Sequence, residues 1–223
     1  MKIINVAIDG PAGAGKSTIS RKAAAELGYI YIDTGALYRT VGLNAIRKGA
    51  DLQIDESIIA TLTDDVKVEL RFIDGEQRMF LSGEDVSDKI RTPEASMAAS
   101  RVSAVPKVRE YLFDLQKKLA RENSCVMDGR DIGTVVLPDA DVKIFLTASP
   151  EARAERRYKE LIEKGMDVKL EDVLADMVKR DYDDSHRAIA PLKQADDAVL
   201  CDTSELNLQE SIELIIRTIK ENI

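Results

Sequence analysis

The residues best suited to chemistry lie near the N-terminus, at positions 10–17. They read Gly-Pro-Ala-Gly-Ala-Gly-Lys-Ser and fit the pattern G-x-x-x-x-G-K-[ST]. Such glycines let successive backbone N–H groups turn around a phosphate, and the dipole of a following helix adds to the attraction. Lys16 can reach the β- and γ-phosphates, and the Ser17 hydroxyl can bind Mg²⁺. The segment therefore predicts binding of a nucleoside triphosphate, with a chance Gly-rich turn as the alternative.

A carboxylate that helps to hold the metal is expected at the end of a neighbouring strand. Asp128 meets this requirement, because it ends the apolar run 125–127 and is followed directly by Gly129, Arg130 and Asp131. Ligands of open α/β sheets bind at the carboxyl ends of the strands. We therefore expect Ser17 and Asp128 to bind Mg²⁺, Asp128 directly or through water.

Arginines are plentiful near the predicted strand ends, whereas His186 is the only histidine. Arg153, Arg156 and Arg157 have the i, i+3, i+4 spacing of one helix face. Any one of them alone is readily explained by a surface ion pair. Together they suit phosphoryl transfer, in which cations stabilise the charge that spreads over the moving group. The catalytic residues that we expect are Lys16, Arg130, Arg153, Arg157 and Arg187.

The shortage of histidine also bears on the acceptor. A phosphate monoester is already anionic near neutral pH and needs no general base, whereas a hydroxyl acceptor needs a positioned carboxylate. Many arginines and one histidine favour the phosphate acceptor, although Asp33 or Asp131 could serve as a base.

The order of the predicted elements indicates the fold that positions these residues. Strand-like runs occupy residues 3–8, 29–32, 125–128, 142–146 and 198–201. Helical patterns occupy residues 16–27 and 208–219, follow residue 35 up to about 49, and begin at Pro150 and Leu170. This alternation predicts an α/β fold of three α/β/α layers around a parallel sheet of about five strands.

One stretch departs from this alternation. Apolar and charged residues alternate from Val66 to Phe72, and Asp74-Gly75 offers a hairpin turn before a second run at 78–81. We expect an inserted antiparallel β unit at residues 64–90, acting either as an elaborated edge or as a flap near a ligand cleft.

Composition limits the class of protein. The 223 residues carry 32 Lys+Arg and 40 Asp+Glu, a net charge of −8, and 44% are hydrophobic. This length predicts a single domain, residues 1–223. The acidic balance argues against general nucleic-acid binding, and the absence of a long apolar run argues against a membrane span. Two cysteines are too few for a disulfide scaffold, so we expect a cytoplasmic protein.

Four motifs together resemble the bacterial cytidylate (CMP) kinase family of nucleoside monophosphate kinases. They are Ile8-Asp9 with the phosphate loop, residues 33–39 (Asp-Thr-Gly-Ala-Leu-Tyr-Arg), residues 128–134 (Asp-Gly-Arg-Asp-Ile-Gly-Thr), and Arg180-Asp181 with Asp184 and residues 187–192. The resemblance covers essentially the whole chain and implies a P-loop kinase that transfers phosphate from ATP to CMP or dCMP with Mg²⁺, as a monomer. It also implies that the β unit belongs to the monophosphate-binding region and that residues 150–190 carry a short helical lid.

The same resemblance implies roles for individual residues. ATP would be bound by Gly10, Pro11, Ala12, Gly13, Ala14, Gly15, Lys16, Ser17, Thr18 and Arg156. The acceptor phosphate would be held by Arg39, Arg130 and Arg187, the cytosine by Ser100, Arg109 and Asp131, and the pentose by Arg180 and Asp184; Thr34 and Tyr38 would line the same pocket. Cytosine needs both an acceptor and a donor from the protein, and Asp131 can accept while Ser100 and Arg109 can donate.

Two other functions remain open at this point. One is a regulatory nucleotide-binding module. That function would leave the clustered arginines unexplained, and the sequence contains no Asn-Lys-x-Asp motif of the kind that recognises guanine. The other is a kinase for a different small molecule, such as UMP, dTMP or a sugar.

Overall fold

The computed structural model describes residues 2–223. The chain divides into two compact units. The first comprises the residues up to Ile32 together with Ala120–Ile223, and the second comprises Asp33–Leu119. The antiparallel β unit expected at residues 64–90 lies within the second unit, which extends beyond it on both sides.

The first unit is built on a sheet of five strands in the order β2-β6-β1-β7-β8. The strands are β1 (Asn5–Asp9), β2 (Ile30–Asp33), β6 (Cys125–Gly129), β7 (Val142–Thr147) and β8 (Val199–Asp202). β1 pairs in parallel with β6 on one side and β7 on the other, and β7 pairs in parallel with β8. The predicted parallel α/β fold with about five strands is therefore confirmed.

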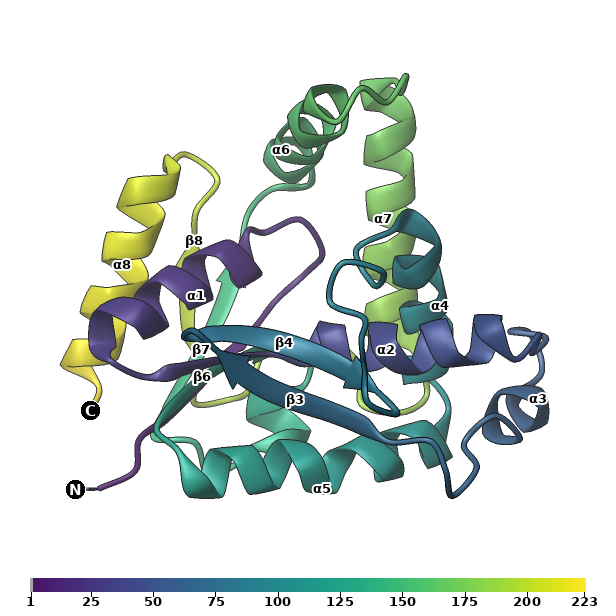
Figure 1. Ribbon diagram of the computed structural model, residues 1–223. Helices are drawn as coiled ribbons and strands as arrows, with labels where there is room; N and C mark the ends of the chain where they lie inside the picture. Colours follow the sequence, from purple (N-terminus) through teal and green to yellow (C-terminus); the bar gives the residue numbers. More distant parts are fainter. Residues whose placement is uncertain (1) are drawn as a thin grey trace. The chain divides into compact units, whose positions relative to one another are not determined.

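Helices flank this sheet. They are α1 (Lys16–Leu27), α6 (Pro150–Glu163), α7 (Leu170–His186) and α8 (Leu208–Glu221), with a π-helical turn η1 (Ile132–Val136) after β6. In Figure 1, α1 and α8 lie side by side. They share a core with the inner strands to which Ile8, Leu146 and Ile215 contribute fully buried side chains.

The second unit combines a small sheet with four helical segments. Its helices are α2 (Thr34–Arg47), α3 (Asp55–Ile59), α4 (Pro93–Ser103) and most of α5 (Pro106–Glu122). Its strands β3 (Val68–Ile73), β4 (Glu76–Leu81) and β5 (Glu84–Asp85) pair antiparallel in that order. Asp74 and Gly75 join β3 to β4 with positive φ at both residues, as the predicted hairpin turn requires.

Local sequence signals explain several element boundaries. α6 begins where expected, because the Ser149 hydroxyl accepts a hydrogen bond from the Ala152 N–H and Pro150 takes the first helical position. α1 ends at Gly28, whose left-handed conformation closes the helix. The sequence prediction omitted α3, α4, α5 and η1. Among residues 2–223, every helix is too short or too polar to cross a membrane.

Candidate active site

The phosphate loop follows β1 and leads into α1, as predicted. Gly10 is required by space, because a Cβ there would lie 1.9 Å from the Leu146 carbonyl oxygen. Gly13 faces α7, and a Cβ on it would lie 2.8 Å from the Met177 methyl carbon. The Leu146 backbone cannot move aside, so space requires glycine at position 10. The Met177 methyl group can move, but the φ of 72° at Gly13 is a left-handed conformation that favours glycine.

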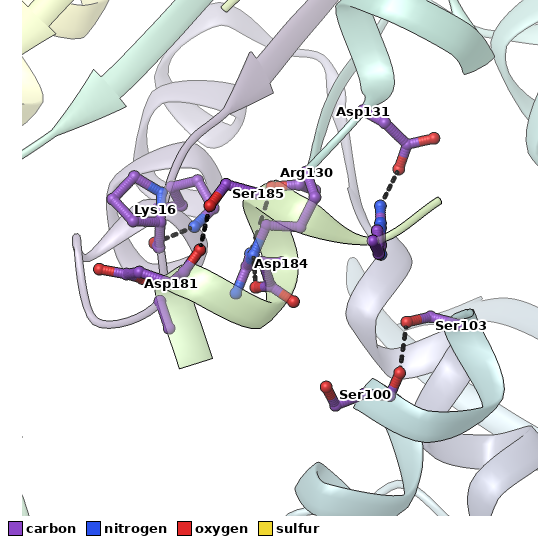
Figure 2. Close-up of polar contacts among 12 residues, drawn as sticks. Lys16, Ser100, Ser103, Arg130, Asp131, Asp181, Asp184 and Ser185 are labelled. Carbon is purple, nitrogen blue, oxygen red and sulfur yellow. Dashed lines mark hydrogen bonds and ion pairs between the residues drawn. The ribbon is translucent and has the colours of Figure 1, made fainter. Parts of the chain in front are cut away.

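Lys16 is buried at the start of α1, and its Nζ donates a hydrogen bond of 2.7 Å to the Pro11 carbonyl (Figure 2). Burial and the positive charges of Arg130 and Arg180 lower the pKa of Lys16 well below its usual value, although Asp128 and Asp9 oppose the shift. A bound phosphate would add negative charge beside Lys16 and so favour its protonated form. Lys16 is thus held in the loop that is expected to bind a phosphate.

Ser17 and Asp128 meet as expected. The Ser17 hydroxyl donates to Oδ2 of Asp128 at 3.0 Å, and the Tyr31 hydroxyl donates to Oδ1 at 3.1 Å. Asp128 ends the buried part of β6, and Tyr31 lies on the adjacent strand β2. The hydroxyl and carboxylate oxygens are hard ligands of the kind that Mg²⁺ prefers, so the pair fits that metal.

A second cluster joins the segment after β6 to α7. Nε of Arg130 donates to Oδ2 of Asp184 at 2.8 Å, an ion pair drawn in Figure 2. Burial raises the pKa of Asp184, but the charge and hydrogen bond of Arg130, with the charges of Arg180 and Arg187, outweigh burial and lower the pKa. Asp184 is therefore held as a carboxylate among three arginines.

Arg187 and Asp131 extend this cluster. The guanidinium of Arg187 donates to Oδ1 of Asp131 at 3.3 Å, and Nε donates to the Ala190 carbonyl. Both side chains are largely buried, at 10% and 6% exposed. The predicted residues Arg130, Asp131, Asp184 and Arg187 are thus brought together by the fold of the first unit.

The three arginines of α6 have different surroundings. Arg153 is 3% exposed and donates to the carbonyls of Ala12 and Ala148, and its guanidinium pairs with Asp181 at 2.7 Å. Arg156 donates to the carbonyls of Thr203 and Leu206. Arg157 is more exposed and pairs with Glu160 one helical turn away. Arg153 therefore contacts the phosphate loop itself, whereas Arg156 holds the turn after β8.

Of the remaining predicted residues, Thr18 on α1 and Arg180 on α7 lie in the first unit, and the others lie in the second. Asp33 caps α2 by accepting from the Ala36 N–H at 2.9 Å, and its other oxygen pairs with Arg39 at 2.7 Å. The Arg109 guanidinium lies 5.8 Å from the centre of the Tyr38 ring and donates to the Ser103 carbonyl.

Two further members of the predicted set lie near these groups. Thr34 is buried at the first position of α2. Ser100 is half-buried on α4, and its carbonyl accepts from the Ser103 hydroxyl (Figure 2). The expected base-reading residues of this unit therefore come from α4 and α5, and the expected pocket-lining residues come from α2.

Comparison with known proteins identifies the family. The model of the family described as cytidylate kinase matches residues 6–221. The chain belongs to the cytidylate kinase family. Among curated members, the cytidylate kinase of Caldicellulosiruptor bescii is 48% identical over 227 residues and is covered in full, as is this chain. That of Caldanaerobacter subterraneus subsp. tengcongensis is 50% identical over 220 residues, which are 98% of this chain and 96% of the relative.

Solved structures support the fold. A crystal structure of an uncharacterized protein from Eubacterium ventriosum superposes with a TM-score of 0.55 at 14% sequence identity, covering 97% of this chain and 98% of that one. A likeness at this level of identity concerns the fold alone.

Two residues contact the predicted set without being predicted themselves: Tyr31 bonds Asp128, and Asp181 pairs with Arg153. A third, Asp9, accepts two backbone hydrogen bonds from η1, directly after Asp131. Asp9 and Asp181 lie within the family motifs, so a motif search could have selected them. Tyr31 carries no comparable signal, since a tyrosine in a strand usually serves as core.

Proposed function

We propose that this member of the family transfers the γ-phosphate of ATP to CMP or dCMP, giving ADP and CDP or dCDP. One observation carries the proposal beyond family membership: Arg130, Asp131, Asp184 and Arg187 form a buried charged cluster in the same unit as the phosphate loop. Burying such charges costs folding free energy, and clusters of this kind are typical of functional sites.

Lys16 is proposed to bind the β- and γ-phosphates, together with the backbone N–H groups of residues 10–18 other than Pro11, which has none. Ser17 and Asp128 would hold Mg²⁺, Asp128 directly or through water, and the metal would neutralise charge on the phosphates. Support comes from the 3.0 Å contact between the two side chains, which presents two oxygens at the start of α1. Arg153 would keep the loop in place, and its direct contact with a phosphate stays a prediction.

The acceptor is proposed to be bound by the residues that the family resemblance implies. Arg39, Arg130 and Arg187 would hold its phosphate, which attacks as an anion without a general base. Ser100, Arg109 and Asp131 would recognise cytosine, and Arg180 and Asp184 would contact the pentose. Thr34 and Tyr38 would line the pocket, with Arg156 and Arg157 acting toward ATP and the moving phosphoryl group. A monomeric state and a cytoplasmic location also stay predictions.

The cytosine assignment has a chemical basis. A carboxylate of Asp131 can accept from the exocyclic amino group of cytosine, whereas uracil presents an acceptor at the same edge. The mismatch would leave buried polar groups unpaired, which discriminates strongly between substrates.

An acceptor panel tests the proposal. With ATP and Mg²⁺, release of ADP should be fast with CMP and dCMP and weak with UMP, AMP, dTMP or a sugar. Equal rates with AMP would overturn it, and ATP binding without transfer to any acceptor would favour a regulatory module. As a further check, Asp131→Ala should relax the preference for cytosine more than it weakens ATP binding.

A further inference from the structure

Asp9 is a buried carboxylate to which no role in the reaction has so far been given. It is the last residue of β1, directly before the phosphate loop, and it is 4% exposed. Aspartate is a poor strand former, and a buried carboxylate costs folding free energy that an apolar residue would not. Burial raises the pKa of Asp9 to about 6, against the opposing effect of two backbone hydrogen bonds. The fold alone therefore does not explain this residue.

The two carboxylate oxygens have specific partners. Oδ1 accepts from the Ile132 N–H at 2.8 Å, and Oδ2 accepts from the Gly133 N–H at 2.7 Å. These are the first two amides of η1. Gly133 fits closely, because a Cβ there would lie 3.4 Å from Oδ2 of Asp9 and 3.3 Å from Cδ of Lys143. Asp9 therefore fastens the start of this turn to the end of β1.

This contact changes what Asp131 can do. Asp131 occupies the N-cap position of η1, where an aspartate ordinarily accepts from the amides of its own turn. Its side chain makes no such capping bond here. Asp9 satisfies the two amides instead, and Oδ1 of Asp131 accepts from Arg187. The neighbouring residue Arg130 pairs with Asp184.

We infer that Asp9 is a positioning residue for the acceptor side of the reaction: by capping η1 from outside, it directs Asp131 and Arg130 toward their ligands. This inference rests on the proposed function. Asp9 touches neither substrate nor metal in the proposal, and it acts through the backbone of residues 131–133. The phosphate loop has independent support from Arg153 at the Ala12 carbonyl and from Met177 beside Gly13. Loss of the Asp9 contact should therefore affect the nucleoside monophosphate more than ATP.

Asp9→Asn is the direct test. The oxygen of the asparagine amide can accept one of the two hydrogen bonds. Its NH₂ group, however, faces the other backbone N–H, so two donors repel each other where a hydrogen bond stood. We expect the KM for CMP to rise by about tenfold or more, the effect of losing one charge-assisted hydrogen bond, while the KM for ATP changes by less than about threefold. The ratio of kcat/KM for CMP over UMP should fall, which a general loss of stability would not cause.

Asp141→Asn is the matched control. Asp141 also accepts a backbone hydrogen bond from β1, at Asn5 and 2.9 Å, but at the opposite end of the strand from the phosphate loop. This variant should leave both KM values and the CMP:UMP ratio unchanged. If Asp9→Asn behaves like Asp141→Asn, the inference is wrong. If the wild-type protein fails to phosphorylate CMP, the proposed function fails instead, and the two failures are thereby distinguished.

A measurement on the wild-type protein covers the case in which Asp9→Asn does not fold. Backbone hydrogen exchange at neutral pH should show the amides of Ile132 and Gly133 protected to the same degree as the amides of β1. Exchange at the rate of exposed loop amides would overturn the inference.

Discussion

The buried ion pair between Arg153 and Asp181 gives the sharpest prediction. Arg153 on α6 donates to the Ala12 carbonyl of the phosphate loop and to the Ala148 carbonyl, and it pairs with the carboxylate of Asp181 on α7 at 2.7 Å. The side chains are 4% and 23% exposed. In Asp181→Asn the guanidinium can still donate to both carbonyls, but it loses the carboxylate that neutralises and orients it, with little change in side-chain volume.

The expected cost follows from these values. Removing one partner of a fully buried pair destabilises a protein by about 3–5 kcal/mol. Because Asp181 is partly exposed, water can replace some of the lost interaction. We therefore expect the free energy of unfolding to fall by about 2–3 kcal/mol in this variant, and the KM for ATP to rise because Ala12 is held less firmly.

Urea unfolding followed by circular dichroism, with a kinetic assay, measures both effects. Asp183→Asn is the control, since Asp183 lies on the same helix but pairs with Lys179 at the surface, with side chains 52% and 75% exposed. That surface pair should contribute less than about 0.5 kcal/mol to the free energy of unfolding. Equal destabilisation in the two variants would show that the Arg153–Asp181 pair contributes no more to stability than a surface ion pair.

Three further predictions concern other buried groups. Tyr31→Phe removes the hydrogen bond to Asp128, so the Mg²⁺ concentration for half-maximal activity should rise by about fivefold; an unchanged Mg²⁺ titration would contradict this. Burial and Asp131 raise the pKa of Asp9 from 3.8 to about 6, although backbone bonds and Lys16 lower it, so the folded state binds the extra proton between these pH values. The stability of the wild type relative to Asp9→Asn should then fall by about 2 kcal/mol as pH rises from 4 to 7, and parallel stability curves would refute it. Cys125 is buried and its pKa is raised to about 12, so native protein should resist iodoacetamide at this residue, as peptide mapping can check.

Much of the first unit could be predicted because its signals are local. α1 runs from Lys16 to Leu27 as expected, since the phosphate loop and Gly28 mark its two ends. The start of α6 follows from Ser149 and Pro150 in the same way. The carboxyl ends of parallel strands lie on one edge of a sheet, and this explains why the Ser17–Asp128 contact could be anticipated.

The second unit was harder to predict. α4 is rich in alanine and serine, which give a weak apolar periodicity, and its close packing on α2 depends on Gly42 facing Ala98. α5 carries a clear amphipathic pattern that the prediction omitted, with Val108 and Leu112 fully buried.

Supporting contacts of the site could not be read from spacing. Asp9 bonds a residue 123 positions away, and Tyr31 bonds one 97 positions away. Nothing in the local sequence of either residue specifies such a partner. Motifs thus indicate which side chains meet the ligands, whereas the groups that hold those side chains in place depend on the tertiary fold.

The strand order has a consequence for biosynthesis. β1 lies between β6 and β7, and its residue Val6 pairs with Val126 and Val142. At ribosomal rates of about 5–20 residues per second, β6 is synthesised roughly 6 to 25 seconds after β1, so β1 has no paired neighbour during that time. The second unit, continuous from Asp33 to Leu119, is complete before either neighbour has been made. Its early folding would turn a long flexible loop into a compact body, lowering the chain entropy lost when β1 finally pairs.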